Sequence, residues 1–339
     1  MRRTVFGMAK LFSYIGNFNG GSKWAGGVLA PNGKIYCIPY GSSQILVVDP
    51  VTNFTELFGN FPGTGKYIGG VLAPNGKIYC APYIGASILV INPANNTTEL
   101  IGDFGTNLKW IGGVLAPNGK IYCPPTGSIQ MLVIDPTTNT TELIGTISGG
   151  SSRYYGGVLA PNGKIYCVAR TTTAILIIDP TNNTTELIGN FSGTDKWAGG
   201  VLAPNGKIYC IPSRSNQILV INTANNTTEL IGNFSGTEKW IGGTLAPDGK
   251  IYCVPLNSTQ VLIIDPTTNT TELIGNFSGG NRFAGCVLAP SGKIYGVPNS
   301  SSQVLSVNIN KVPVASSHTN IPVLTNLANS LYNKYFNKI

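Results

Sequence analysis

The chain has 339 residues and a formal net charge of +8, and only 11% of its residues are charged. No apolar run approaches the roughly 20 residues that a membrane-spanning helix needs. The basic N-terminus, whose apolar stretch is interrupted by Lys10, has no small-residue cleavage site and does not match a signal peptide. We therefore expect an intracellular or virion protein that makes no membrane contact and has an anionic partner, such as an acidic protein or nucleic acid.

A short apolar segment, F-S-Y-I-G-N-F at Phe12 to Phe18, precedes seven copies of G-G-V-L-A-P-N-G-K-I-Y-C, the last in the altered form G-C-V-L-A-P-S-G-K-I-Y-G. The copies follow one another at steps of 43 or 44 residues and begin at Gly26, Gly69, Gly112, Gly156, Gly199, Gly242 and Gly285. In the fifth copy, residues 197–204, 207–212, 217–222 and 228–234 each have the apolar pattern of a strand, and Asn205-Gly206 is a hairpin signal. Four strands in such a period indicate a propeller blade, whereas a solenoid would need atypical capping repeats, which are absent. The sequence predicts an all-β, seven-bladed β-propeller over residues 1–310.

The seventh copy has the first three strands but lacks the fourth, T-E-L-I-G-N-F. The similar segment at residues 10–18 is predicted to supply this outer strand, which closes the ring and removes an open sheet edge. Residues 311–339 form a tail, in which Asn320 and Pro322 mark a helix start. Apolar residues from Leu324 to Tyr335 form one stripe of that helix. The stripe is expected to pack on the propeller or to dock to another subunit or partner, so it could mediate self-association.

Seven cysteines include six at one repeat position and Cys286, which replaces the second glycine of the last copy. Equivalent positions in neighbouring blades should lie about 10 Å apart, too far for a disulfide, and no C-x-x-C pair indicates zinc. We expect free, reduced thiols and no metal. The repeated Glu and Asp residues fit strand starts and turn capping. With no catalytic motif present, we expect no enzyme activity, no catalytic residues and no cofactor.

A cation followed by an aromatic residue precedes each Gly-Gly, in the loop that leads into each blade. The pairs are Lys23-Trp24, Lys66-Tyr67, Lys109-Trp110, Arg153-Tyr154, Lys196-Trp197, Lys239-Trp240 and Arg282-Phe283. One interpretation makes the aromatic an inter-blade wedge beside a solvated cation. The other makes the fourteen residues a ring that binds an anionic or sugar-like ligand by charge and stacking. Both interpretations leave the cations near solvent.

A second set of cations follows the Asn-Gly hairpins and is expected on the opposite face, with the repeat glutamates nearby. Its members are Lys34, Lys77, Lys120, Lys164, Lys207, Lys250 and Lys293. The loop after the second strand varies most between copies, from P-Y-G-S-S to A-R-T-T-T and P-S-R-S-N. Variation on a constant frame is where partner choice could be encoded, although drift without selection would give the same variation.

The pattern A-P-N-G-K-I-Y followed by I-L-V-I-D-P-T-T-N-T-T-E-L-I resembles the propeller repeats of the NHL, YVTN and streptogramin-lyase group. It is similar also to highly uniform tandem repeats in proteins of giant DNA viruses and some protists. The resemblance covers residues 10–310 and implies the fold, because such repeats serve lyases, scaffolds and ligand binders alike. The lyases use histidines with a carboxylate and a divalent metal, whereas the single histidine here, His318, lies in the tail.

From these features we expect a non-enzymatic binding or structural scaffold, in a viral or other intracellular setting, that engages an anionic partner through the basic-aromatic ring. One alternative is a multivalent lectin-like carbohydrate binder with Trp24, Trp110, Trp197 and Trp240 as stacking platforms. A lyase-like propeller enzyme is a further alternative.

Overall fold

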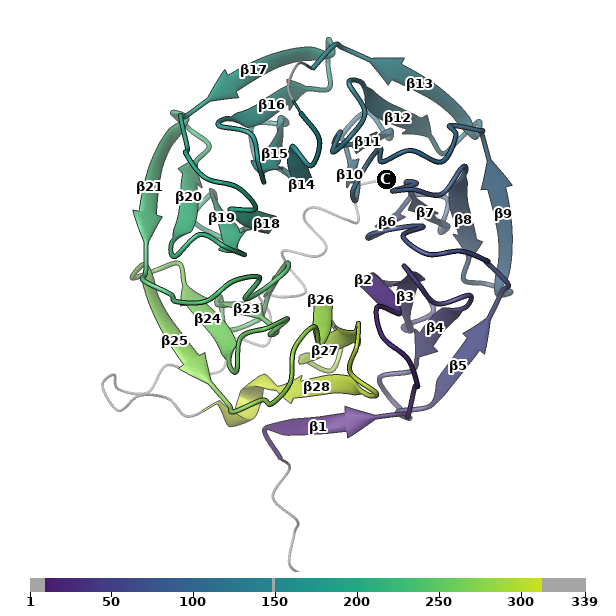
Figure 1. Cartoon of the computed structure of the whole chain (residues 1–339), viewed down its shortest axis with the longest axis vertical. Coiled ribbons are helices and arrows are strands. Elements are labelled where there is room, and N and C mark those ends of the chain that lie inside the picture. Colours follow the sequence, from purple (N-terminus) through teal and green to yellow (C-terminus); the bar gives the residue numbers. More distant parts are fainter. Residues whose placement is uncertain (1–9, 148–149, 313–339) are drawn as a thin grey trace, which may run out of the picture.

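The computed structural model describes residues 10–147 and 150–312, and it is a ring of seven four-stranded antiparallel sheets (Figure 1). This arrangement confirms the predicted seven-bladed β-propeller. The tail helix predicted within residues 311–339 lies almost wholly outside the described residues. Blade 1 contains β2 to β5, blades 2 to 6 follow in chain order, and blade 7 contains β26, β27, β28 and β1.

Each blade runs from an inner strand at the ring axis to an outer strand at the rim. The inner strands are β2 (Trp24–Leu29), β6 (Val71–Leu72), β10 (Val114–Leu115), β14 (Tyr154–Leu159), β18 (Trp197–Leu202), β22 (Thr244–Leu245) and β26 (Phe283–Leu288). The second strands are β3 (Ile35–Pro39), β7 (Ile78–Cys80), β11 (Ile121–Cys123), β15 (Ile165–Ala169), β19 (Lys207–Pro212), β23 (Ile251–Cys253) and β27 (Lys293–Pro298).

The third strands are β4 (Ile45–Val48), β8 (Ile88–Asn92), β12 (Met131–Asp135), β16 (Ile175–Asp179), β20 (Ile218–Asn222), β24 (Val261–Asp265) and β28 (Val304–Asn308). The outer strands are β5 (Thr55–Phe58), β9 (Thr97–Ile101), β13 (Thr140–Ile144), β17 (Thr184–Ile188), β21 (Thr227–Ile231), β25 (Thr270–Ile274) and β1 (Phe12–Ile15). A short 3-10 helix, η1 (Ile309–Lys311), follows β28. The outer strands end before the predicted Phe234, because Gly232 turns the chain with φ +77° and Phe234 packs edge-on against Trp240.

The core lies between neighbouring blades, because the second and third strands carry apolar side chains on both faces. Val201, Tyr209 and Ile211 of blade 5, for example, pack with Ile251 and Leu262 of blade 6 in one buried cluster. The Gly-Gly pair allows the inner strands to converge on the axis. A Cβ on Gly26, which has φ +78°, would lie 2.7 Å from the Cα of Gly69, and a Cβ on Gly27 would lie 2.9 Å from Val287.

The N-terminal segment closes the ring, as predicted. Strand β1 pairs antiparallel with β28, from Phe12 opposite Val307 to Ile15 opposite Val304. The Phe12 ring also packs edge-on against Phe277 of blade 6, at 5.0 Å between centroids. Because the chain runs from β1 directly into β2 of blade 1, the non-covalent pairing of β1 with β28 closes the ring, and β28 has no free edge.

All seven cysteines are free and six of them are buried, in agreement with the expectation of unpaired thiols. Burial raises the pKa of the Cys37 and Cys286 thiols to about 12. In blades 1, 4 and 5 the repeat cysteine lies opposite the second glycine across the first two strands, as Gly27 lies opposite Cys37. Blade 7 reverses this pair, because Cys286 lies opposite Gly296. One cysteine side chain therefore fills the space at this pair of positions, from the second strand in blades 1, 4 and 5 and from the first strand in blade 7.

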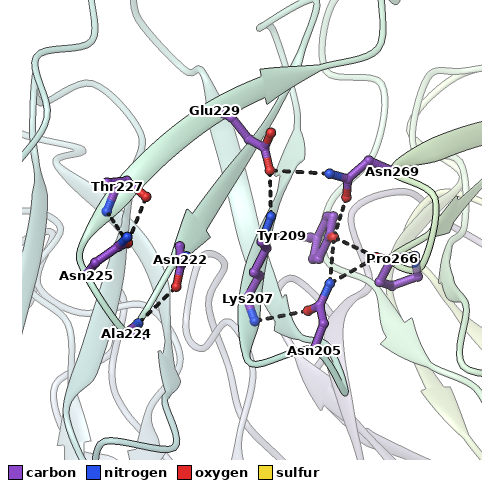
Figure 2. Close-up of polar contacts among 10 residues, drawn as sticks. All are labelled: Asn205, Lys207, Tyr209, Asn222, Ala224, Asn225, Thr227, Glu229, Pro266 and Asn269. Atoms are coloured by element: carbon purple, nitrogen blue, oxygen red, sulfur yellow. Dashed lines mark hydrogen bonds and ion pairs between the residues drawn. The ribbon is translucent and has the colours of Figure 1, made fainter.

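The repeated Tyr and Asn residues join neighbouring blades at the Asn-Gly hairpins. In Figure 2, the Tyr209 hydroxyl donates to Asn269 Oδ1 of blade 6 at 2.6 Å, and Asn205 Nδ2 donates to the carbonyl of Pro266 at 2.9 Å. The same contacts join blades 1–2, 2–3, 3–4 and 4–5. At the blade 6–7 junction the hairpin residue is Asp248, which accepts the Tyr252 hydroxyl at 2.7 Å. Blade 7 has no turn between β28 and β1 and so offers no asparagine there.

Candidate functional site

The strand directions divide the connections between two faces of the ring. Loops into each inner strand and loops after each second strand share one face, the loop face; for example, Tyr40 N donates to the Lys23 carbonyl at 3.0 Å. The Asn-Gly hairpins and the turns after the third strands share the other, the hairpin face, where Asn32 Nδ2 donates to the Pro93 carbonyl at 2.9 Å. The basic-aromatic pairs lie on the loop face, and the second lysine set lies on the hairpin face, as expected.

The seven cations of the basic-aromatic pairs are buried, so the expectation that they lie near solvent is wrong. Their exposed fractions are 2–7%, for Lys23, Lys66, Lys109, Arg153, Lys196, Lys239 and Arg282. Each donates to backbone carbonyls of the surrounding loops: Lys23 Nζ to Gly20 at 2.5 Å, Lys196 Nζ to Thr172 at 2.7 Å, and Arg282 to Ser258. The long side chains turn back into their own loops, and so these cations hold the loop face together.

Lys239 has the most complete set of acceptors. Its Nζ donates to the carbonyls of Ser213 and Ser215, both at 2.8 Å, and of Gly236 at 3.0 Å. The three carbonyls come from two loops, the one after β19 and the one that leads into β22. Burial lowers the pKa of Lys239 to about 8, and burial likewise lowers the pKa values of Lys23, Lys66, Lys109 and Lys196.

The aromatic partners are wedges between blades. Trp24, Trp110, Trp197 and Trp240 are each no more than 2% exposed. Their indole N–H groups donate to the carbonyls of Gln44, Gln130, Gln217 and Gln260 at 2.8–2.9 Å. The tryptophans therefore present no ring face on which a sugar could stack, which removes the feature on which the lectin interpretation depended.

The two faces differ in charge. The loop face carries nine cations, the seven buried ones with Arg170 and Arg214, but only three carboxylates, Asp103, Asp195 and Glu238. Apart from Arg153, none of the buried seven has a carboxylate within 4.0 Å in the described residues. The hairpin face carries nine lysines in the described residues, the seven repeat lysines with Lys10 and Lys311, and eleven carboxylates, with Lys207 and Glu229 paired at 2.9 Å. The excess of cations over carboxylates gives the loop face a positive potential.

Residues that differ between copies meet on the loop face near the axis. The third residue after the repeat cysteine is Tyr40 in blade 1, Tyr83 in blade 2 and Arg170 in blade 4. The Tyr40 and Tyr83 rings are 6.2 Å apart, and the Arg170 guanidinium lies 5.4 Å from the ring centre of Tyr155. Burial raises the pKa of Tyr83, whereas Arg170 lowers it by charge and hydrogen bonding, so these two side chains also meet. We call Tyr40, Tyr83, Tyr155 and Arg170 the axial cluster.

A row of charged side chains continues outward from the axial cluster across blades 4, 5 and 6. Arg170 Nε lies 2.7 Å from Asp195 Oδ1, Arg214 Nε lies 3.6 Å from Asp195 Oδ2, and Arg214 Nη2 donates to Glu238 Oε1 at 2.9 Å. The Arg170 and Arg214 side chains are 26% and 44% exposed. They are the loop-face cations that a partner can touch. The sequence signal for them was the variation of the loop after the second strand.

Other chemistry is limited in the part of the chain that the structure describes. No group of three or more His, Cys, Asp or Glu side chains there could hold a metal ion. Within residues 10–147 and 150–312, no helix has the length and apolarity to cross a bilayer.

No family model matches the sequence, and no curated protein sequence matches it. Among solved structures, the chain is similar to virginiamycin B lyase from Staphylococcus aureus, with a TM-score of 0.77, 10% identity, and coverage of 88% of this chain and 99% of that one. A streptogramin B lyase gives a TM-score of 0.76 and 12% identity, over 88% and 97% of the two chains. The extracellular domain of a hybrid two-component system from B. thetaiotaomicron gives 0.69 and 12%, over 91% and 44%.

These likenesses contradict the expectation that the chain is not an enzyme, because the same seven-bladed fold carries lyases. Residues that differ between copies gather in a single asymmetric cluster at the axis, so the repetition of the blades does not make the loop face uniform. At 10–12% identity the likeness shows the fold alone. The chain is a seven-bladed β-propeller of the architecture found in the streptogramin and virginiamycin B lyases.

Proposed function

We propose that this propeller is a binding module whose loop face engages an acidic protein segment. The observation that supports the proposal is the charge difference between the faces in the described residues, nine cations and three carboxylates on the loop face against nine cations and eleven carboxylates on the hairpin face. Buried charges act through a medium of low dielectric, so their field extends above the loop face and attracts anions. The field does not require that the partner touch the buried cations.

Direct contact falls to the axial cluster and the charged row. Arg170 is held against Tyr155 and by Asp195, and Arg214 reaches both Asp195 and Glu238. A protein carboxylate fits this arrangement better than a nucleic-acid backbone does. Phosphate tracking needs many accessible cations along a path, whereas among the described residues the loop face has two accessible cations, Arg170 and Arg214, which stand side by side at Asp195.

The test compares two matched glutamates. Glu238 on the loop face pairs with Arg214 at 2.9 Å and is 41% exposed, and Glu229 on the hairpin face pairs with Lys207 at 2.9 Å and is 45% exposed. Fluorescent poly-glutamate serves as the probe and a single-stranded oligonucleotide as the competitor. Removing one exposed charge about 10 Å from the bound anion should change affinity about twofold at low salt.

We expect Glu238→Gln to bind poly-glutamate about twofold more tightly, Glu229→Gln to bind it like the parent chain, and the complex to weaken as salt rises. Equal effects of the two substitutions would mean that only net charge matters. Tighter binding of the oligonucleotide than of poly-glutamate would replace the acidic protein with nucleic acid as the partner.

A further inference from the structure

At three loop-face positions, blade 2, blade 3 or both carry an apolar residue where other blades carry a polar one. The fourth residue after the repeat cysteine is Ile84 in blade 2 but Thr171, Arg214 and Asn257 in blades 4 to 6. Two residues further, Ala86 and Ile129 occupy blades 2 and 3, and Ser, Thr or Asn occupies the other five. The residue before the buried cation is Leu108 at the entry to blade 3 but Asp195 and Glu238 at the entries to blades 5 and 6. We call Ile84, Leu108 and Ile129 the apolar sector.

In each blade of the apolar sector, a large side chain in one loop packs against a glycine in the neighbouring loop. Ile84 N donates to the Gly65 carbonyl at 2.9 Å, and a Cβ on Gly65 would lie 2.9 Å from the Ile84 side chain. In blade 3 the sizes are exchanged, because Leu108 lies beside Gly127, where a Cβ would lie 2.8 Å from Leu108 Cγ. The same two positions in blade 5 hold Asp195 and Arg214, joined by Arg214 N donating to the Asp195 carbonyl at 3.0 Å.

The apolar sector differs from the other exposed hydrophobic residues in where its members lie on the ring. Ile84 is 37% and Ile129 58% exposed, and they are the loop-face members of the large exposed hydrophobics in the described residues. Of the other nine, Val51 and Phe54 lie in the single turn between β4 and β5 on the hairpin face, and seven lie one per blade on the outer strands: Tyr14, Leu57, Leu100, Leu143, Leu187, Leu230 and Leu273. Such evenly spaced single side chains need no partner, whereas apolar residues gathered in adjacent loops indicate an interaction surface.

The apolar sector adjoins the axial cluster. Lys109 N, next to Leu108, donates to the Tyr83 carbonyl at 2.8 Å. Across the axis from blades 2 and 3, blades 5 and 6 carry the charged row (Figure 1). One face thus offers an aromatic centre, an apolar side and a charged side, within a positive field.

We propose that the segment bound on the loop face is amphipathic: its acidic side chains face Arg170 and Arg214, and its apolar side chains cover Ile84, Leu108 and Ile129. This inference rests on the proposed function and adds the second chemical requirement for the partner. Charge complementarity selects the acidic half of that segment, and the exposed apolar sector beside the same cluster selects the other half.

The test is selection of binders from a random peptide library displayed on phage, with the parent chain as bait. Selected peptides should be enriched in Asp and Glu and also in aliphatic or aromatic residues. One selected peptide is then measured against Ile84→Ser/Ile129→Ser and against the rim control Leu187→Ser/Leu230→Ser, after both variants are shown to melt like the parent. The first variant should bind about tenfold more weakly, because the apolar contact is lost, and the rim control should bind unchanged.

Acidic peptides without apolar enrichment, or equal affinity of the two variants, would overturn this inference and leave the proposed function standing. Selection of peptides that are not acidic would overturn the proposed function itself.

Discussion

Lys239→Met should destabilise the propeller although it removes a charge from a positively charged chain. The residue is 2% exposed, and its ammonium donates three hydrogen bonds to carbonyls at 2.8, 2.8 and 3.0 Å. Removing one member of a buried charged network costs about 3–5 kcal/mol. Two effects offset part of that loss: Met carries no desolvation penalty, and the loop carbonyls regain hydrogen bonds to water. We expect a loss of about 2–3 kcal/mol in the free energy of unfolding.

The assay is thermal and urea unfolding, with Lys120→Met on the hairpin face as the control. At about 2 °C per kcal/mol for a chain of this size, Lys239→Met should lower Tm by roughly 5 °C. Lys120→Met should change Tm by less than about 1 °C, because Lys120 is only partly buried and substitutions at the surface, away from buried networks, stay within about 0.5 kcal/mol. Equal effects of the two substitutions, or an unchanged Tm for Lys239→Met, would refute the structural role of the buried cations.

The pH dependence of stability gives a second measurement on the same pair. Burial lowers the pKa of Lys239 to about 8, so the folded protein releases this proton before the unfolded chain does, whose lysine titrates near 10.4. Between those values the unfolded state binds more protons, and the contribution of Lys239 to stability therefore rises with pH. Below pH 8 its desolvation cost is present in full. Lys239→Met should lose this rise, and Lys120→Met should keep it.

Three further predictions concern the frame. In blade 7, Cys286→Gly and Gly296→Cys should each destabilise by about 1–2 kcal/mol, and the double variant, which restores the repeat pattern, should recover most of the loss in denaturant unfolding; additive losses would contradict the exchange of space. Tyr209→Phe should cost about 1 kcal/mol, because its hydroxyl joins blades 5 and 6; an unchanged midpoint would remove that role. Deleting residues 1–18 should expose the β28 edge, and size-exclusion chromatography should show dimers or aggregates; a monomer of unchanged Tm would contradict ring closure.

The frame was predictable from the sequence because its determinants are local and repeated. Asn205-Gly206 specifies a hairpin whatever surrounds it, and the missing T-E-L-I in the last copy has one counterpart, the F-S-Y-I at residues 12–15. Both predictions concern backbone pairing, which a period of 43 residues repeats seven times over.

The burial of the cations was missed, because it depends on where loop carbonyls point. A lysine in a polar loop is usually solvated, and nothing adjacent to Lys239 indicates otherwise. The available signal was the glycine three residues earlier: Gly236 has φ +98° and Gly193 +94°, and their carbonyls accept Lys239 and Lys196. That Gly-x-x-Lys spacing recurs at Gly20 and Gly63, with the same contact to Lys23 and Lys66.

The axial cluster could not be predicted from any single repeat. Tyr83 and Arg170 lie 87 positions apart in the sequence, in different blades, and meet only because the ring brings their loops to the axis. The variable loop was identified as the place where specificity could be encoded, but the members of a cluster depend on side-chain lengths across the axis. Sequence reasoning favoured residues present in all seven copies, and the structure uses those residues to build the ring.

The account divides the chain into repeated residues that build the ring and variable loop residues that bind, and hydrogen–deuterium exchange with bound poly-glutamate tests that division most directly. We predict slower exchange in the loops after the second strands of blades 4 and 5, residues 170–174 and 213–217, which carry Arg170 and Arg214, and unchanged exchange in the seven hairpins between the first and second strands. Equal protection of all seven blades, or protection confined to the hairpin face, would contradict it.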